Sequence, residues 1–256
     1  MSPYNIHLIS YKIPNKNIPV EWVNSIKQWR DVNPNAIVKV WNNVELDNFV
    51  DNLSSEYRAV YDGLQYWIQK FDFIRLIILY EYGGMYSDLD IVPKVPFDFI
   101  NNYNMPFFCS FRHNADQEST LYYNNSLFGS SAKHPLILEL IERIIFNYNN
   151  KVGYTFKNKI FRVLYSTGPF MLSNVLMNTT HPYITLPRGL INSCHIDDPV
   201  PCTKEGSLVI HLKGRSWLDT SDKFFYCFFE SANMKNAMIF LLILFFGLII
   251  WISILL

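Results

Sequence analysis

Apolar and polar residues follow one another in the N-terminal part of the chain as expected for a strand, a helix and a second strand. Asn5–Ser10 is a short apolar run that ends at a proline-containing segment, and it predicts a buried strand. Glu21–Arg30 carries large apolar residues at helical spacing, and Ala36–Trp41 predicts the next strand. This order is typical of a βαβ unit, so we expect an α/β fold with a parallel sheet covered by helices.

Further elements follow from the same periodicities. Helices are predicted over Glu45–Asn52, Ile68–Tyr82 and Pro135–Asn147, an extended stretch over Tyr86–Val92 and a late strand over Ser207–Leu212. The Gly83-Gly84 pair is a stop signal for the helix that precedes it.

The last part of the chain has a different character. Ala237–Leu256 carries no charge, and Ser253 is its one polar side chain. About twenty apolar residues in a helix span the roughly 30 Å hydrocarbon core of a bilayer. A buried core helix is the alternative, but a helix that is apolar all round would need protein on every side. We therefore predict a transmembrane helix over 237–256, a linker over 231–236 and one large domain over 1–230.

The flanking charges predict the orientation of this helix. Lys223 and Lys235 precede it, and the positive-inside tendency then places the large domain in the cytosol. No secretory signal is visible at the N-terminus. The sequons at Asn52, Asn124 and Asn178 are accordingly interpreted as chance matches.

Composition narrows the classes of function. Lys plus Arg and Asp plus Glu are equal at 22 each, so no basic surplus points to a nucleic-acid partner. The four cysteines have no CxxC spacing, which gives a structural zinc site little support. Cys194 and Cys202 could lie close in one loop, but we expect free thiols because no secretory signal precedes them.

Two acidic residues carry the first candidate chemistry. In an extended backbone, Tyr86, Asp88 and Asp90 would lie on one face. Two carboxylates on one face repel each other unless a cation lies between them, and Mn²⁺ or Mg²⁺ could also bridge to a diphosphate. A DXD sequence arises by chance about once in a chain of this composition, and a solvated turn is the alternative. The apolar Leu89 and Ile91 favour a stretch that is rooted in a core.

A second candidate pair lies on the helix ahead of this stretch. Asp72 and Arg75 are three positions apart and share a helix face. An exposed ion pair worth about 0–1 kcal/mol is the simplest reading. The helix is otherwise almost wholly apolar, however, and burial of both charges is costly unless they are paired. We therefore favour a functional pair.

The stretch Phe71–Asp90, FDFIRLIILYEYGGMYSDLD, resembles the signature of glycosyltransferases with a DXD sugar-binding region. That family includes initiating α-1,6-mannosyltransferases and inositol phosphoceramide mannosyltransferases. Further similar elements are Ile6–Ile9, Asn125 ahead of His134-Pro135, Thr167-Gly168-Pro169, and His211 with Ser216-Trp217. The tryptophan that usually follows the first strand is replaced by Ser10-Tyr11.

The resemblance implies a fold and a set of roles. It implies a GT-A type, Rossmann-like domain that binds a nucleoside-diphosphate sugar. Metal ligands would be Asp88, Asp90 and His211; catalytic residues would be Asp72, Arg75, Asp88 and Asp90; and donor-binding residues would be His7, Ile9, Tyr86, Asn125, Ser216 and Trp217. Taken alone, His211 is better interpreted as a satisfied core histidine, but together with Ser216-Trp217 and the DXD residues the metal role is favoured. For His7, a strand histidine bonded to neighbouring backbone is an equally good interpretation. Lys213 and Arg215 could reach phosphates or remain solvated.

The sequence thus predicts a membrane-anchored, Mn²⁺- or Mg²⁺-dependent hexosyltransferase that acts on a glycan or glycolipid with retention of configuration. Mannose is the favoured sugar, and transfer from UDP-glucose or UDP-galactose is an alternative. A catalytically silent protein that binds nucleotide sugars is a second alternative. Metal-dependent phosphoryl transfer has less support, because no G-x-x-x-x-G-K loop or third clustered carboxylate is visible.

Overall fold

The computed structural model describes residues 4–99, 105–110, 123–191, 201–212 and 222. The chain divides into two compact units, Met1–Gly214 and Arg215–Leu256, and Asp222 is the one described residue of the second. The predicted linker and transmembrane helix therefore lie outside the described residues. Within the described ranges, no helix has the length and apolar character needed to cross a bilayer.

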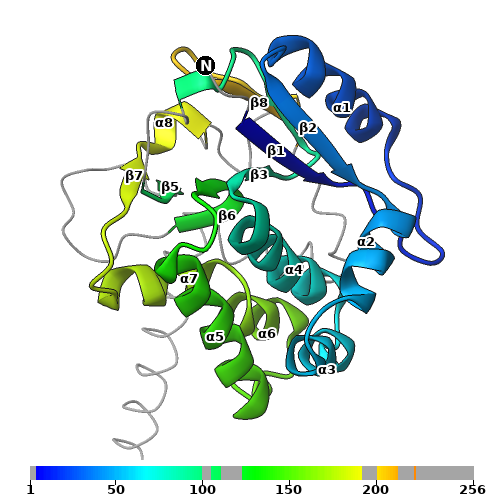
Figure 1. The fold of residues 1–256 in the computed structure, drawn as a ribbon, viewed down its shortest axis with the longest axis vertical. Coiled ribbons are helices and arrows are strands. Elements are labelled where there is room, and N and C mark those ends of the chain that lie inside the picture. Colours follow the sequence, from blue (N-terminus) through cyan, green and yellow to red (C-terminus); the bar gives the residue numbers. More distant parts are fainter. Residues whose placement is uncertain (1–3, 100–104, 111–122, 192–200, 213–221, 223–256) are drawn as a thin grey trace, which may run out of the picture. The chain divides into compact units, whose positions relative to one another are not determined.

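The first unit contains both strands and helices (Figure 1). In chain order the elements are β1 (Tyr4–Ile9), α1 (Val20–Val32), β2 (Ala36–Trp41), α2 (Asn43–Asp51), α3 (Ser55–Gly63), α4 (Trp67–Tyr82), β3 (Gly84–Ser87), β4 (Ile91–Pro93), β5 (Phe107–Ser110), β6 (Tyr123–Ser130), α5 (Pro135–Asn149), α6 (Lys159–Ser166), α7 (Pro169–Asn178), β7 (Ile184–Leu186), α8 (Arg188–Ile191) and β8 (Val209–His211).

Most strands form one mixed sheet in the order β2-β1-β3-β6-β5-β7. β1 pairs in parallel with both β2 and β3, which confirms the predicted βαβ start. β6 runs antiparallel to β3 and β5, so the expectation of a parallel sheet holds only in part. An antiparallel pair needs no helical crossover, and no α-helix of the described residues lies between β3 and β6. β4 and β8 form a separate antiparallel pair.

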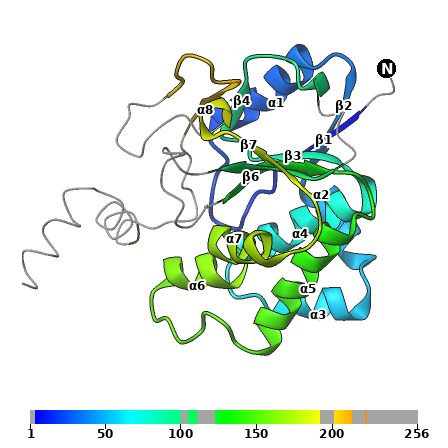
Figure 2. The same cartoon turned by 90° about the vertical axis from the view of Figure 1, so that its left-hand side faces the viewer.

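Helices cover both faces of the sheet, as Figure 2 shows. α3 to α7 lie on one side, and α1, α8 and β4 lie on the other. Each face of the sheet packs against its helices through a separate apolar core. One is built around α4 and α5, with Phe73, Ile77 and Leu140 fully buried or nearly so. The other core lies on the opposite face of the sheet and contains Trp29 of α1 and Leu8 of β1, both fully buried.

The glycine pair after α4 sets the path of the chain into β3. Gly83 ends the helix with φ +62°, and Gly84 follows with φ +95°, a conformation that side chains other than glycine rarely adopt. A Cβ at Gly84 would also lie 2.4 Å from the carbonyl oxygen of Asn5. The pair therefore lets β3 pack closely beside β1 and delivers the acidic stretch at the end of β3.

The cysteines differ from expectation. Cys202 is disulfide-bonded. The prediction of a free thiol is therefore wrong for Cys202, while Cys194 falls outside the described residues. Cys109 of β5 is free and buried. The absence of a visible secretory signal was a poor guide to the oxidation state of Cys202.

Candidate active site

The DXD residues lie in a tight turn between β3 and β4. The Ile91 amide donates to the Asp88 carbonyl across 3.2 Å, and the Asp88 amide donates to Ser126 of β6 across 2.7 Å. The predicted extended stretch over Tyr86–Val92 is therefore wrong at its centre, because the strand stops after Ser87. Aspartate is favoured at the first position of such turns. The carboxylates of Asp88 and Asp90 are placed by this turn and not by strand alternation.

Helix α1 fixes the turn from the other side of the sheet. The Oγ of Ser25, which is fully buried, lies 2.7 Å from the carbonyl oxygen of Leu89. The indole of Trp29 donates to the carbonyl of Ile91 across 2.9 Å. The Leu89 side chain is buried in the same core. The backbone of the turn is therefore anchored on both flanks, while Asp88 and Asp90 remain partly exposed.

Arg75 connects the helix to the turn. Its side chain is only 3% exposed, and its guanidinium nitrogens lie 3.2 Å from Oδ1 of Asp72 and 3.1 Å from Oδ1 of Asp88. It also donates to the Asn125 carbonyl across 2.7 Å and lies 4.6 Å from the centre of the Tyr86 ring. An exposed ion pair is thus excluded. Arg75 is a buried cation that joins two acids from different elements.

Asp72 has two further partners from distant parts of the chain. The Asn125 amide donates to its Oδ1 across 2.8 Å, and the Thr167 hydroxyl donates to its Oδ2 across 2.9 Å. Burial raises the pKa of Asp72 to about 7, whereas Arg75 and the two hydrogen bonds favour the ionised form. Thr167 is not among the site residues predicted from the sequence, although its Thr-Gly-Pro element is part of the family resemblance.

The Asp88 carboxylate is 32% exposed and meets charges of both signs. Burial is the main cause that raises its pKa to about 6, Arg75 opposes this shift, and Asp90 adds to it. The Tyr86 hydroxyl donates to the same carboxylate across 2.7 Å. Asp88 and Asp90 are therefore close enough to repel each other, and a divalent cation between them would relieve that repulsion.

His211 is brought beside the DXD turn by the second sheet. It pairs with Ile91 of β4, and the Leu212 amide donates to the Asp90 carbonyl across 2.8 Å. Its Nε2 is hydrogen-bonded to the carbonyl of Ile191, so Nδ1 would be the ligating nitrogen in a metal complex. Two carboxylates and one imidazole suit Mn²⁺. Even so, no three acidic, histidine or cysteine side chains in the described ranges form a ready-made metal cluster.

The other residues predicted to bind the donor lie in different parts of the structure or outside the described residues. Asn125 and Tyr86 belong to the Arg75 cluster described above. Ile9 is buried at the end of β1. His7 is buried in the same strand; its Nε2 lies 2.9 Å from the Gly83 carbonyl, and Trp41 donates to its Nδ1 across 3.3 Å. These contacts fit the alternative of a strand histidine bonded to its neighbours. Ser216 and Trp217, with Lys213 and Arg215, lie outside the described residues.

A known protein family matches the part of the chain that contains α4 and the DXD turn. Residues 19–106 match the model of the glycosyltransferase sugar-binding region containing a DXD motif. This range includes the helix with Asp72 and Arg75 as well as the turn with Asp88 and Asp90. This part of the chain is a DXD-containing glycosyltransferase sugar-binding region. The resemblance predicted from the sequence is thereby confirmed, and the match supports the enzyme class predicted with it.

Named relatives of this chain include two from Schizosaccharomyces pombe. Inositol phosphoceramide mannosyltransferase 1 is 28% identical over 232 residues, which cover 88% of this chain and 65% of the relative. Inositol phosphoceramide mannosyltransferase 3 is 29% identical over 159 residues, covering 61% of this chain and 40% of the relative. The chain thus spans less than two thirds of the length of either protein.

A solved structure agrees with the fold. The PaToxG glycosyltransferase superposes with a TM-score of 0.51 at 20% sequence identity, and the match covers 68% of each chain. At this identity the similarity concerns the fold alone. It confirms the coarse expectation of a mixed α/β fold.

Proposed function

We propose that the chain transfers a hexose, with mannose favoured, from a nucleoside-diphosphate sugar to a glycolipid. The observation that carries the proposal is the buried Arg75 guanidinium, which joins Asp72 to the partly exposed Asp88 of the DXD turn. The mannosyltransferase names of the relatives support the choice of sugar, and their inositol phosphoceramide names support a glycolipid acceptor.

In this proposal Asp88, Asp90 and His211 hold a divalent cation, with Mn²⁺ preferred to Mg²⁺. The bound ion would supply Lewis-acid stabilisation of charge on the departing diphosphate. Asp72 and Arg75 orient the transferring sugar by hydrogen bonds to its hydroxyls. Because Thr167 and Asn125 already hold Asp72 in place, little reorganisation would be needed when the donor binds.

The sugar, the stereochemistry and the activity itself are separable parts of the proposal. Transfer with retention of configuration rests on the family resemblance, and no residue is proposed as a covalent nucleophile. UDP-glucose or UDP-galactose as donor is the alternative within the enzyme class. A silent nucleotide-sugar-binding protein is the alternative outside it, and the intact Asp72, Arg75, Asp88 and Asp90 argue against that reading.

We further propose that the domain works in an oxidising compartment at a membrane. Disulfides persist in secretory compartments and are rare in the cytosol, and Cys202 is disulfide-bonded. This proposal replaces the cytosolic location expected from Lys223 and Lys235. The apolar segment 237–256 remains the predicted membrane anchor.

A donor panel tests the function. The full chain in detergent is incubated with Mn²⁺ and with GDP-mannose, UDP-glucose or UDP-galactose, and sugar release and transfer to a glycolipid are measured. GDP-mannose is expected to be the best donor, and Asp90→Asn is expected to abolish turnover. The enzyme reading fails if no nucleotide sugar is hydrolysed or transferred and Asp90→Asn leaves donor binding unchanged.

A further inference from the structure

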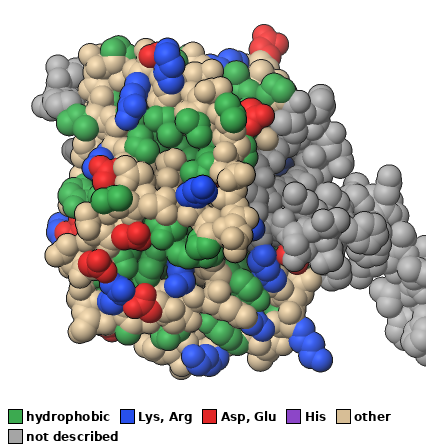
Figure 3. All heavy atoms as spheres, turned by 90° about the vertical axis from the view of Figure 1, so that its right-hand side faces the viewer, with side chains coloured by type: hydrophobic (Ala, Val, Ile, Leu, Met, Phe, Trp, Pro, Cys, Tyr) green, Lys and Arg blue, Asp and Glu red, His purple; other side chains and the backbone are tan. Residues whose placement is uncertain are grey.

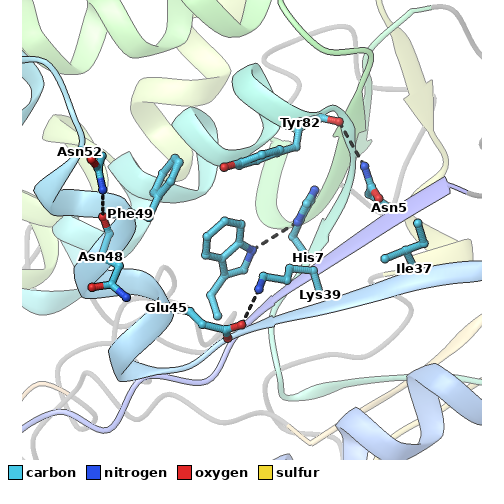
Figure 4. Close-up of a pocket in the computed structure, with 10 residues that line it drawn as sticks. Asn5, His7, Ile37, Lys39, Glu45, Asn48, Phe49, Asn52 and Tyr82 are labelled. Carbon is cyan, nitrogen blue, oxygen red and sulfur yellow. Dashed lines mark hydrogen bonds and ion pairs between the residues drawn. The ribbon is translucent and has the colours of Figure 1, made fainter.

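A pocket of about 700 Å³ opens beside β1 and β2, apart from the Arg75 cluster. Its walls come from these two strands, from α2 and from the last residue of α4 (Figure 4). None of Asp72, Arg75, Asp88 or Asp90 lines it. Its volume lies within the range of about 300–1,000 Å³ that is usual for small-molecule sites. The proposed transfer reaction gives this pocket no role.

Three aromatic rings form one wall of the pocket. The ring centre of Trp41 lies 5.1 Å from that of Phe49 and 5.7 Å from that of Tyr82, and the last two are 5.9 Å apart. Trp41 is only 5% exposed, whereas Tyr82 is 49% exposed. The cluster is therefore anchored in the core by Trp41 and presents Tyr82 to the opening. An anchored aromatic ring with exposed surface offers a stacking platform.

The polar lining carries no net charge. Lys39 and Glu45 form an ion pair with each other, and the Lys39 ammonium also lies 5.3 Å from the centre of the Trp41 ring. His7 reaches the pocket from β1, and burial lowers its pKa to about 4, so its ring is neutral near pH 7. The remaining polar groups are amides, among them Asn5 and the exposed Asn48.

The surrounding surface is also electrostatically mixed. Figure 3 shows the side of the molecule on which β2 and α2 lie in Figure 1. Basic and acidic side chains are interspersed there with apolar ones, and no broad area of one sign forms among the coloured residues. A phosphate or carboxylate ligand would therefore meet neither an unpaired cation in the lining nor a favourable field at the opening.

We propose that this pocket is a second carbohydrate site, which binds a neutral hexose unit of a glycan. The pyranose ring would place its C–H face on Tyr82, and its hydroxyls would bind the amides of Asn5 and Asn48 and the Lys39–Glu45 pair. A sugar ring that is apolar on one face and rich in hydroxyls at its edge matches an aromatic wall with a polar rim of no net charge. Binding here needs no metal, no nucleotide and no turnover.

The test measures equilibrium binding to the full chain in detergent by saturation-transfer NMR, with mannobiose and cellobiose as probes and glucose 6-phosphate as the charged comparator. At least one neutral disaccharide is expected to bind, and to bind equally well to Asp90→Asn. Tyr82→Ala should weaken binding about tenfold, as expected for the loss of one aromatic contact. Tyr165→Ala changes a tyrosine of similar exposure, 43%, on α6, and should have no effect.

A second variant keeps the proposal testable in case Tyr82→Ala does not fold. Asn48→Ala removes an exposed amide without touching the aromatic rings, and it should also weaken binding. The proposal is overturned if neither disaccharide binds, if glucose 6-phosphate binds more tightly, or if Asp90→Asn loses disaccharide binding. Equal affinity in the wild type, Asn48→Ala and a folded Tyr82→Ala would overturn it as well. This test measures binding in the absence of donor and metal. Its result is therefore independent of whether the donor panel detects sugar transfer.

Discussion

The hydroxyl of Thr167 donates to the buried carboxylate of Asp72 across 2.9 Å, between residues that are 95 positions apart in the chain. Thr167 lies just ahead of α7, and Asp72 lies on α4. This bond and the Asn125 amide support the acid that pairs with Arg75. The orientation of Asp72 therefore depends on two segments outside its own helix.

Removal of the Thr167 hydroxyl should weaken both stability and activity. Thr167→Val keeps the volume but leaves one oxygen of Asp72 without its donor, which should cost about 1–3 kcal/mol of unfolding free energy. Thr167→Ser retains the hydroxyl and should lose much less. Urea unfolding and donor turnover measure the two effects. Equal stability of Thr167→Val and Thr167→Ser would contradict the role of the hydrogen bond.

Replacement of Arg75 by lysine should be severe although the charge is kept. A lysine ammonium cannot reproduce the planar set of contacts to Asp72, Asp88 and the Asn125 carbonyl. Loss of one partner in a buried ion pair costs about 3–5 kcal/mol. The matched control is Arg58→Lys, whose side chain is 41% exposed and pairs with Asp51 and Asp62. Its expected cost is about 0–1 kcal/mol. Thermal unfolding of the two variants should separate them clearly, and similar melting temperatures would argue against a buried pair.

Local patterns were sufficient for the first part of the fold. β1, α1 and β2 follow from runs of apolar residues, and the end of α4 follows from Gly83-Gly84. The short α3 was missed because its nine residues are mostly polar or small. β6 was missed for another reason: Asn124, Asn125 and Ser126 interrupt its apolar run, and the strand is defined by its pairing with β3 and β5.

In the candidate site, too, some features follow from local sequence and others depend on contacts between distant parts of the chain. The pairing of Asp72 with Arg75 could be predicted because both lie on one helix face. The turn at Asp88 could not, since the bond to Ser126 that holds it comes from a distant strand. The placement of His211 beside Asp90 depends likewise on the pairing of β4 with β8. A family pattern supplied that placement where periodicity could not.

Mn²⁺ should stabilise the protein through the DXD turn. A ligand that binds only the folded state at about 100 times its dissociation constant adds roughly 2.7 kcal/mol of stability. Asp90→Asn should abolish most of the rise in melting temperature on addition of Mn²⁺. Glu81→Gln is the control, because Glu81 is an exposed acid paired with Lys133 at the end of α4. The ligand assignment is wrong if both variants respond to Mn²⁺ as the wild type does.

His7 should make the protein less stable in acid. Burial lowers its folded-state pKa to about 4, below the usual value of 6.5, so the unfolded chain binds the proton more readily. Its contribution to stability is therefore complete above pH 6.5 and is lost as the pH falls towards 4, with a limiting slope of about 1.4 kcal/mol per pH unit. Asp72 and Asp88 have raised pKa values and act in the opposite direction, so the comparison needs a variant. Chemical unfolding of the wild type and His7→Gln at several pH values isolates the histidine. Parallel stability curves for the two proteins would show that His7 is not held neutral.

The compartment can be tested through the sequons. Asn52 and Asn178 are exposed, whereas the Asn124 side chain lies within β6 and accepts from the Ser126 amide across 2.9 Å. If the domain faces a secretory lumen, as the disulfide at Cys202 indicates, Asn52 and Asn178 should each carry a glycan in eukaryotic cells and Asn124 should carry none. Digestion with an N-glycanase should then lower the apparent mass. Asn52→Gln and Asn178→Gln should each remove one step of that shift, with Asn124→Gln as the control that removes none. A domain that shows no shift, and whose Cys202 reacts with thiol reagents without prior reduction, would instead face the cytosol.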